Sequence, residues 1–271
     1  MKKYLSFLFL LVLFCLSSAA LAQDLRVDFY DMGKADAMLI TTPDGAHILI
    51  DTGTNKGGKM LCERFKQEGI TTIDLMLITH FDKDHVGGAD KIIEDFSVSQ
   101  VILPDYFKES KQYDQLIEAL EESPETTVTK LPAKKTLSFT YGDTSLLLSA
   151  AQETFYGADE ENDFSIAARL TYGDTRFLFT GDAEDARQRE LLAEGDVACD
   201  VLKVPYHGRL VAASEAFLRA CNPKIAFIPD SDEEPSHPYI TELLKSMGTD
   251  VHSAQDGDLT VLSDGKAVRV G

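Results

Sequence analysis

Four side chains that can bind a metal ion occur within six residues of the sequence: His80, Asp82, Asp84 and His85. They follow the apolar run Leu75–Ile78 directly. Two carboxylates and two imidazoles so close together are costly to bury unless a cation offsets the repulsion and the loss of solvation. In an extended loop, His80, Asp82 and Asp84 turn toward one side while His85 points elsewhere. This pattern predicts two neighbouring divalent metal ions.

Three more candidate donors follow apolar runs: Asp51 follows Ile48–Ile50, Asp182 closely follows Phe177–Phe179, and His207 closely follows Val201–Val204. Continuous apolar runs of this length are typical of strands buried on both faces, and ligand sites in such sheets gather at the strand ends. We therefore expect His80, Asp182 and His207 to lie within reach of one another.

Two divalent cations about 3.5–4 Å apart polarise a substrate oxygen and lower the pKa of a bridging water, which supplies hydroxide near neutral pH. The predicted chemistry is hydrolysis. An oxygen-rich, Asp-containing site suits phosphodiesters and accepts Mn²⁺ as well as Zn²⁺. We expect Lys34, Lys203 and Arg209 to be candidates for supplying positive charge to a phosphate.

The elements that must position these residues alternate between strand and helix, which predicts an α/β fold. Segments with a helical pattern separate the apolar runs. They are Lys59–Glu68, Gly88–Phe96, Ala183–Ala193, Ser214–Cys221, and a segment from Pro238 to near Gly248. The acid-rich stretch 106–135 contains a helix-like segment, Lys111–Glu122. We interpret this stretch as an exposed insertion, because apolar strand runs resume with Ser145–Ser149.

The composition limits the partners of the chain. Its 271 residues include 26 Lys plus Arg against 45 Asp plus Glu, so the formal net charge is -19. Such a surface repels nucleic-acid phosphates at long range, because non-specific affinity for them comes mainly from Lys and Arg. We expect no stable complex with duplex nucleic acid, and a small-molecule or short phosphodiester substrate. Nothing in the sequence specifies a partner protein.

The first 22 residues are typical of a secretory signal peptide. Lys2 and Lys3 precede the apolar stretch Leu5–Leu16, and Ala20-Leu21-Ala22 offers a cleavage site before Gln23. We expect residues 23–271 to form one exported hydrolase domain, periplasmic or extracellular and free of the membrane. An uncleaved membrane anchor is the alternative.

Three cysteines remain after this predicted cleavage: Cys62, Cys199 and Cys221. Their odd number and the lack of CxxC spacing exclude a disulfide framework and disfavour a Cys-ligated zinc site. A single disulfide and three small buried thiols both remain open.

The motif His80-x-Asp82-x-Asp84-His85 resembles the His-x-His-x-Asp-His motif of the metallo-β-lactamase superfamily, with Asp in place of the second His. The resemblance to the hydrolase domain of ComEC-type competence proteins is closer and runs from about Val27 to about Val270. It is carried by similar versions of several segments: Asp31-Met32-Gly33-Lys34-Ala35-Asp36-Ala37, Ile50-Asp51-Thr52-Gly53, Asn162-Asp163-Phe164-Ser165, Phe179-Thr180-Gly181-Asp182, Leu202-Lys203-Val204-Pro205-Tyr206-His207-Gly208 and Asp256-Gly257.

The resemblance implies a four-layer αβ/βα sandwich, the metallo-β-lactamase fold, with a metal site between its halves. The residues that it implies as metal ligands are His80 and Asp82 for the first ion, Asp84, His85 and His207 for the second, and Asp182 as a bridge. It also implies Asp51 as the acid that orients the metal-binding loop. Asp36 is expected either near the metals or as a turn-stabilising residue.

The sequence departs from the superfamily at the first metal, because no His occurs between His85 and His207. Asn162 and Ser165 fit the Asn-x-x-Ser element of ComEC-type proteins in that region. Tyr206 and Arg209 replace the His and Ser of the commoner His-His-Gly-Ser version. The candidate catalytic residues are Asp84, Asp182, Asn162 and Tyr206.

Three other functions stay open at this stage. The first is hydrolysis of a cyclic amide or ester, as in lactamases and lactonases, which Asp82 and the missing His disfavour. The second is a di-iron redox site, disfavoured because such proteins usually carry Glu where Asp82 stands. The third is a metal-binding module without catalysis.

Overall fold

The computed structural model describes residues 23–157 and 161–271. The predicted signal peptide, residues 1–22, lies outside the described residues. Within the described ranges, none of the helices combines the length and the apolar character that a membrane span requires.

Eight strands form the first sheet, in the order β17-β16-β1-β2-β3-β5-β7-β8. Their bounds are β1 (Leu25–Phe29), β2 (Met38–Thr41), β3 (His47–Ile50), β5 (Leu75–Leu77), β7 (Gln100–Pro104), β8 (Thr127–Leu131), β16 (Leu259–Ser263) and β17 (Val268–Val270). The strands β3, β5, β7 and β8 run parallel, whereas β1 pairs antiparallel with β2 and with the C-terminal β16. The two ends of the described chain therefore meet in one sheet.

Seven strands form the second sheet, in the order β15-β14-β13-β12-β11-β10-β9. Their bounds are β9 (Thr136–Tyr141), β10 (Thr144–Ser149), β11 (Ala167–Tyr172), β12 (Thr175–Phe179), β13 (Val201–Lys203), β14 (Ile225–Ile228) and β15 (Asp250–Ser253). A small third sheet pairs β4 (Thr72–Ile73) with β6 (Ser97–Val98). The strands β12 to β15 run parallel, so their carboxyl ends lie at one edge.

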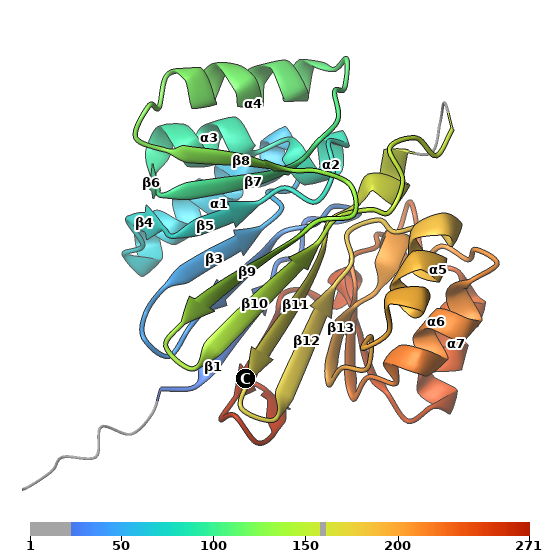
Figure 1. The fold of residues 1–271 in the computed structure, drawn as a ribbon. Coiled ribbons are helices and arrows are strands. Elements are labelled where there is room, and N and C mark those ends of the chain that lie inside the picture. The colour runs from blue at the N-terminus through green and yellow to red at the C-terminus, as the bar shows by residue number, and fades with distance from the viewer. Residues whose placement is uncertain (1–22, 158–160) are drawn as a thin grey trace, which may run out of the picture.

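Helices cover the outer face of each large sheet (Figure 1). The helices of the first half are α1 (Asn55–Glu68), α2 (Lys83–Val86), α3 (Ala89–Asp95) and α4 (Lys111–Glu121), and those of the second half are α5 (Asp185–Glu194), α6 (Ser214–Cys221) and α7 (Pro238–Ser246). Short 3-10 turns occur at η1 (Glu161–Phe164), η2 (Pro205–Gly208) and η3 (Ala254–Asp256). The order helix, sheet, sheet, helix confirms the predicted αβ/βα sandwich.

Three apolar clusters hold these layers together. The largest lies between the sheets and contains Phe29, Phe179 and Phe227 from both of them. The other two pack each helical layer onto its sheet, and Cys62 and Cys221 are buried in them. In the described chain the three cysteines are free thiols, with no disulfide between them.

The predicted helix signals agree with the structure to within a few residues. The first helix begins at Asn55, four residues before the predicted Lys59, because Thr54 caps it by accepting a hydrogen bond from the Gly57 N–H. It ends at Gly69, whose φ of 76° is the left-handed conformation that suits glycine. Pro238 opens α7 as predicted, after His237 caps it.

The interpretation of stretch 106–135 as an exposed insertion is wrong. Its helix α4 buries Tyr113, Leu116 and Ala119 against the first half, and its strand β8 pairs in parallel with β7. The stretch is thus an integral helix and strand of the first sheet. It looked peripheral because β8 is an edge strand, where charged residues are tolerated and only Leu131 is fully buried.

Candidate metal centre

Five of the six predicted metal-binding side chains meet at the carboxyl ends of strands from both sheets. His80 follows β5, Asp84 and His85 lie in α2, Asp182 follows β12, and His207 lies in η2 after β13. All five residues are buried, with relative exposures from 0% to 7%. Residues 127 positions apart in the chain are thereby brought together in one cluster at the seam between the halves.

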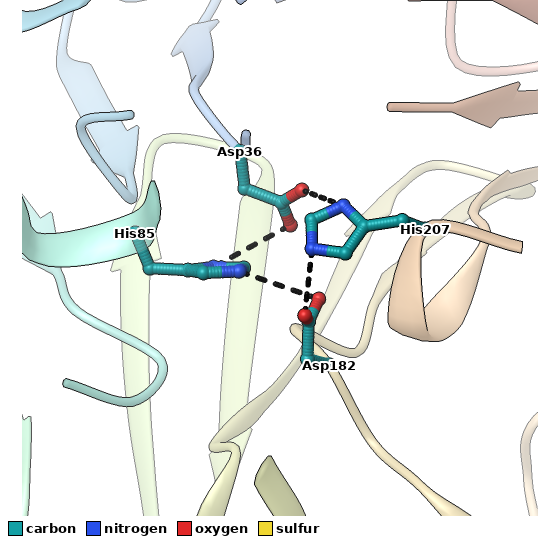
Figure 2. Close-up of side chains that lie close together, drawn as sticks. All are labelled: Asp36, His85, Asp182 and His207. Carbon is teal, nitrogen blue, oxygen red and sulfur yellow. Dashed lines mark ion pairs between the residues drawn. The ribbon is translucent and has the colours of Figure 1, made fainter. Parts of the chain in front are cut away.

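Asp182 lies at the centre of this cluster, between two imidazoles (Figure 2). Its Oδ2 is 2.7 Å from His207 Nε2 and its Oδ1 is 3.3 Å from His85 Nε2. Asp84 Oδ2 lies 3.5 Å from the same His207 Nε2. The ring of His80 lies beside that of His85, tilted by 52°, at a centroid distance of 4.0 Å. These positions allow Asp182 to contact two cations at once, as the sequence predicts for a bridging carboxylate.

Contacts at the Nδ1 atoms orient the imidazoles of His85 and His207. His85 Nδ1 is 2.8 Å from Asp51 Oδ2, and Asp51 also accepts hydrogen bonds from the Thr79 N–H (2.8 Å) and hydroxyl (2.7 Å). His207 Nδ1 donates to the Pro229 carbonyl at 2.9 Å. A neutral imidazole that donates through Nδ1 keeps the lone pair of Nε2 for a metal. Asp51 therefore has the geometry of the orienting acid that the resemblance implies.

Asp36 lies behind these rings. Figure 2 shows its carboxylate facing Nδ1 of both imidazoles, at 3.8 Å from His85 and 3.7 Å from His207. Donor atoms of Asp36, His85, Asp182 and His207 all lie within 4.8 Å of one another. The Nε2 atoms, however, point toward Asp182, so a metal held by them lies on the far side from Asp36.

Lys203 compensates the charge of Asp36. Its ammonium is fully buried, 2.5 Å from Asp36 Oδ2, 2.8 Å from the Gly181 carbonyl and 3.4 Å from Asp182 Oδ1. Burial lowers the pKa of Lys203, but Asp36 and Asp182 outweigh it and raise that pKa above its usual value. Lys203 is therefore not accessible to a substrate. The expectation that it could contact a phosphate is wrong.

The electrostatics of the cluster favour positive charge beside Asp182. Burial acts against charge on Asp182, yet the nearby His207, His85 and Lys203 together hold the pKa of Asp182 well below its ordinary value. Burial likewise lowers the pKa of His85 and His207, but Asp182 and its neighbours outweigh this and raise both. The carboxylates thus stabilise positive charge in the site, which protons on the imidazoles or a bound cation can supply.

Three buried imidazole nitrogens give a direct test of whether a metal fits. The Nε2 atoms of His80, His85 and His207 are buried, and none forms a hydrogen bond of good geometry in the described chain, although those of His85 and His207 face Asp182 oxygens at 3.3 and 2.7 Å. Buried polar atoms are almost always paired in good geometry, so three imidazole nitrogens that converge on two carboxylates without a well-formed hydrogen bond need an explanation. Imidazole nitrogens and carboxylate oxygens are the ligands that zinc and manganese accept. The donor set fits a divalent cation.

Asp82 is the predicted ligand that does not join the cluster. Its Oδ2 is 4.0 Å from His80 Nε2, and its side chain is one third exposed. The other oxygen contacts the ammonium of Lys108, which comes from the loop after β7 and also pairs with Glu161 at 2.5 Å. Burial is the main cause, and the nearby His85 the second, that lowers the pKa of His80 to about 4, so the His80 imidazole stays neutral.

Asn162 and Tyr206 lie near Glu184, at the side of the cluster. Asn162 Nδ2 donates to Glu184 Oε1 at 2.7 Å. Tyr206 lies under the Arg209 guanidinium, 5.3 Å from the ring centre, and burial raises the pKa of its hydroxyl. No hydrogen bond in the described chain joins either residue to the histidines.

Ser165 of the same Asn-x-x-Ser element is the residue that reaches the cluster. Its Oγ accepts the Asp182 N–H at 3.1 Å and lies 3.5 Å from His80 Nδ1. It lies where the superfamily pattern places its further His, and it positions both Asp182 and His80.

The backbone near the donors adopts the left-handed conformation at non-glycine residues. Asp51 has a φ of 55°, and Tyr206 and His207 each have a φ of 51°. Such residues cost about 1–3 kcal/mol each and cluster at functional sites. With this backbone conformation, the short turn η2 directs the His207 ring toward Asp182.

Lys108 is a site residue that sequence reasoning missed. Lys108 lies in the stretch interpreted as an insertion, although it follows the apolar run Val101–Leu103. The rule that ligands gather after buried strands, applied to this run, would have drawn attention to that loop. Ser165 is predicted from the sequence only as part of the Asn-x-x-Ser element, without a specific role.

Comparison with known proteins decides the family. The family model described as the metallo-beta-lactamase superfamily matches residues 30–229. The chain belongs to this superfamily. The superfamily match spans both halves of the sandwich and every residue of the metal cluster.

The curated relatives of this superfamily member include competence protein ComA of Neisseria gonorrhoeae and two proteins with higher identity. It is 25% identical over 240 residues to ComE operon protein 3 of Bacillus subtilis, covering 82% of this chain and 30% of that protein. It is 26% identical over 226 residues to Recombination protein 2 of Haemophilus influenzae, covering 78% of this chain and 25% of that protein. The chain therefore spans less than a third of the length of either relative. These matches confirm the resemblance to ComEC-type proteins.

Solved metallo-β-lactamase folds superpose on the chain at low sequence identity. Tm1679, described as a metal-dependent hydrolase of the beta-lactamase superfamily, matches with a TM-score of 0.59 and 13% identity, covering 89% of this chain and all of that one. A long form of RNase Z from yeast matches with a TM-score of 0.54 and 11% identity, covering 90% of this chain and 42% of that one. At these identities the likeness establishes the fold.

Proposed function

We propose that this protein is an exported metal-dependent hydrolase that cleaves phosphodiester bonds in small or short, nuclease-type substrates. The observation that carries the proposal is the convergence of three buried imidazole Nε2 atoms on the carboxylates of Asp84 and Asp182. That donor set is rich in oxygen, which suits the hard cations used with phosphate esters.

Two divalent ions, zinc or manganese, are the proposed cofactors. Asp84, His85, Asp182 and His207 would hold one ion, and His80, Asp82 and Asp182 the other. When bound, such a pair supplies Lewis acidity and a water of lowered pKa. The set of His80, Asp82 and Asp182, here called the first set, has only one imidazole, so we expect its ion to bind more weakly than the ion of the second set.

The remaining groups bind and orient the substrate. Lys34 is partly exposed, 3.1 Å from Asp84 and 4.0 Å from Glu234, so its ammonium lies at the entrance of the centre and can meet a phosphate oxygen. Arg209, paired with the exposed Glu234, is a second candidate. We propose Tyr206 and Asn162 as substrate-positioning groups, because both flank Glu184 beside the same entrance.

The relatives support a nucleic-acid-derived substrate. One relative is named a recombination protein, another is named competence protein ComA, and a structural neighbour is an RNase Z. The formal net charge of -19 opposes a stable complex with a long duplex. A short or single phosphodiester is the substrate class that satisfies both observations.

Turnover of two chromogenic substrates tests the proposal against lactam hydrolysis. With zinc or manganese supplied, we expect the protein to cleave bis-p-nitrophenyl phosphate and to leave a chromogenic lactam intact. Asp182→Asn should abolish the phosphodiester activity. Lactam cleavage alone would refute the proposal, and metal binding without either activity would favour a non-catalytic module.

Export rests on the sequence of residues 1–22. We propose that they are removed as a signal peptide and that the mature chain starts at Gln23. N-terminal sequencing of the protein recovered outside the cytoplasm tests this: a first residue of Gln23 supports cleavage, and Met1 contradicts it.

A further inference from the structure

The Lys108 ammonium lies between two carboxylates at the edge of the metal centre. It contacts Asp82 Oδ1 and lies 2.5 Å from Glu161 Oε2. The Lys108 side chain is 21% exposed, and those of Asp82 and Glu161 are 34% and 35% exposed. A partly buried ion pair of this kind is screened less by solvent than a surface pair. Lys108 is thus a fixed positive charge beside a residue proposed to bind a metal.

The first metal set has few ligands, so the loss of one of them should weaken metal binding strongly. It consists of His80, Asp82 and a share of Asp182, and Asp82 is the only carboxylate that belongs to it alone. An ammonium on Asp82 both occupies a ligand oxygen and repels a dication nearby. The second set differs in this respect: Lys34 contacts Asp84 there, but His85, His207 and Asp182 remain as donors.

Glu161 can remain the ion-pair partner of Lys108 when a cation binds Asp82. When a cation takes Asp82, the ammonium keeps its ion pair with Glu161 and avoids the cost of a buried unpaired charge. The exchange therefore replaces one partner of Lys108 and leaves the other in place. Without the Glu161 carboxylate, Asp82 would be the remaining carboxylate partner of Lys108 among these three residues. Lys108 would then compete more strongly with a cation for Asp82.

We propose that Lys108 competes with the first metal ion for Asp82, and that Glu161 tunes this competition by drawing Lys108 away. The proposal rests on the proposed metal-dependent function. It makes the chain load its two sites in order, the second set first and the first set only at higher cation concentration. Lys108 is a positioning residue in this scheme.

Calorimetric titration of the purified, metal-stripped protein with Zn²⁺ or Mn²⁺ tests the proposal without any substrate. The wild type should show one tight and one weak site. Lys108→Gln should tighten the weak site by about tenfold, the lower end of the effect of residues around metal ligands, and leave the tight site unchanged. Glu161→Gln should weaken the weak site.

A matched variant and a double variant separate contact from general charge effects. Lys111→Gln removes the same charge three residues away, at the exposed start of α4, and should change neither site. In the Lys108→Gln background, Glu161→Gln should have a smaller effect than it has alone, because the two residues act through one contact. Circular dichroism and thermal unfolding check that each variant keeps its fold.

The proposal is overturned if Lys108→Gln leaves the weak site unchanged or weakens it, or if Lys111→Gln tightens it equally. These outcomes are distinct from failure of the proposed function. A protein that binds two ions as described and cleaves no phosphodiester would refute the function and leave the role of Lys108 standing.

Discussion

The Asp51 carboxylate meets His85 Nδ1 at 2.8 Å, on the opposite side of the ring from Asp182. Asp51 also anchors the Thr79 backbone and hydroxyl, at the start of the loop that carries His80. One buried acid thus fixes both an imidazole and the loop in front of it. Metal affinity should depend on Asp51 although Asp51 touches no metal.

We expect Asp51→Asn to lower the affinity for zinc by about 10–100-fold, because the amide orients and polarises His85 less well. Metal titration measures this. Asp74→Asn is a matched control, since Asp74 accepts the His47 N–H just before β5, away from the cluster. Equal affinities in wild type and Asp51→Asn would contradict the role assigned to Asp51.

Removing Lys203 should leave Asp36 buried without a partner. We expect Lys203→Met to destabilise the fold by about 3–5 kcal/mol, as when one member of a buried ion pair is lost. The double variant Asp36→Asn with Lys203→Met should recover much of this loss. Urea unfolding measures both. A double variant as unstable as the sum of the two single ones would show that the residues act independently.

Gly88 permits the close crossing of α1 and the start of α3. A Cβ at Gly88 would lie 2.5 Å from the Gly58 Cα and 2.5 Å from the Thr52 carbonyl oxygen. We expect Gly88→Ala to destabilise the fold by about 3 kcal/mol through overpacking, measured by urea unfolding.

Gly69→Ala separates this crowding from backbone strain. Gly69 has a φ of 76° and nothing within 4 Å of an added Cβ, so alanine there should cost only about 1–2 kcal/mol. If Gly88→Ala cost no more than Gly69→Ala, the crossing would not depend on the missing Cβ.

Asp163 gives a pH dependence of stability. Its Oδ1 accepts the N–H groups of Glu184 and Arg187 at the start of α5, and burial raises its pKa to about 6. Between the unfolded value near 3.9 and this folded value, the folded state holds a proton that the unfolded state lacks. The contribution of Asp163 to stability therefore grows as pH falls through about 6.

Denaturation of wild type and Asp163→Asn at several pH values measures this. Asparagine still accepts the two N–H groups and does not titrate. The free energy of unfolding of the wild type, relative to the variant, should increase from about pH 7.5 to about pH 5. A difference that stays constant with pH, or decreases as the pH falls, would contradict the raised pKa.

Much of the fold follows from local patterns in the sequence. Runs such as Leu75–Ile78 are apolar on both faces because helices and the second sheet cover them, so they were recognisable as buried strands. Helix ends at Gly69 and Pro238 depend on the backbone freedom of one residue and the fixed φ of the other. Such signals need no tertiary information.

The edge strand β8 carried no such signal, because one side of it has no neighbouring strand and its residues alternate weakly. The place of the Lys108 loop after a buried strand was a usable signal, but the partner of Lys108 was not readable from the sequence. A lysine in an acidic loop is ordinarily a solvated charge, and its contact with Asp82 arises from a separation of 26 residues. His80, His85 and Asp182 were predictable since their types and positions after strands are unusual together.

Anomalous diffraction from crystals grown with Mn²⁺ or Zn²⁺ tests the central claim most directly. We predict a strong peak bounded by Nε2 of His85 and His207 and by the carboxylates of Asp84 and Asp182. Absence of any peak at this cluster, or a peak on the Nδ1 side of the rings beside Asp36, would contradict the account.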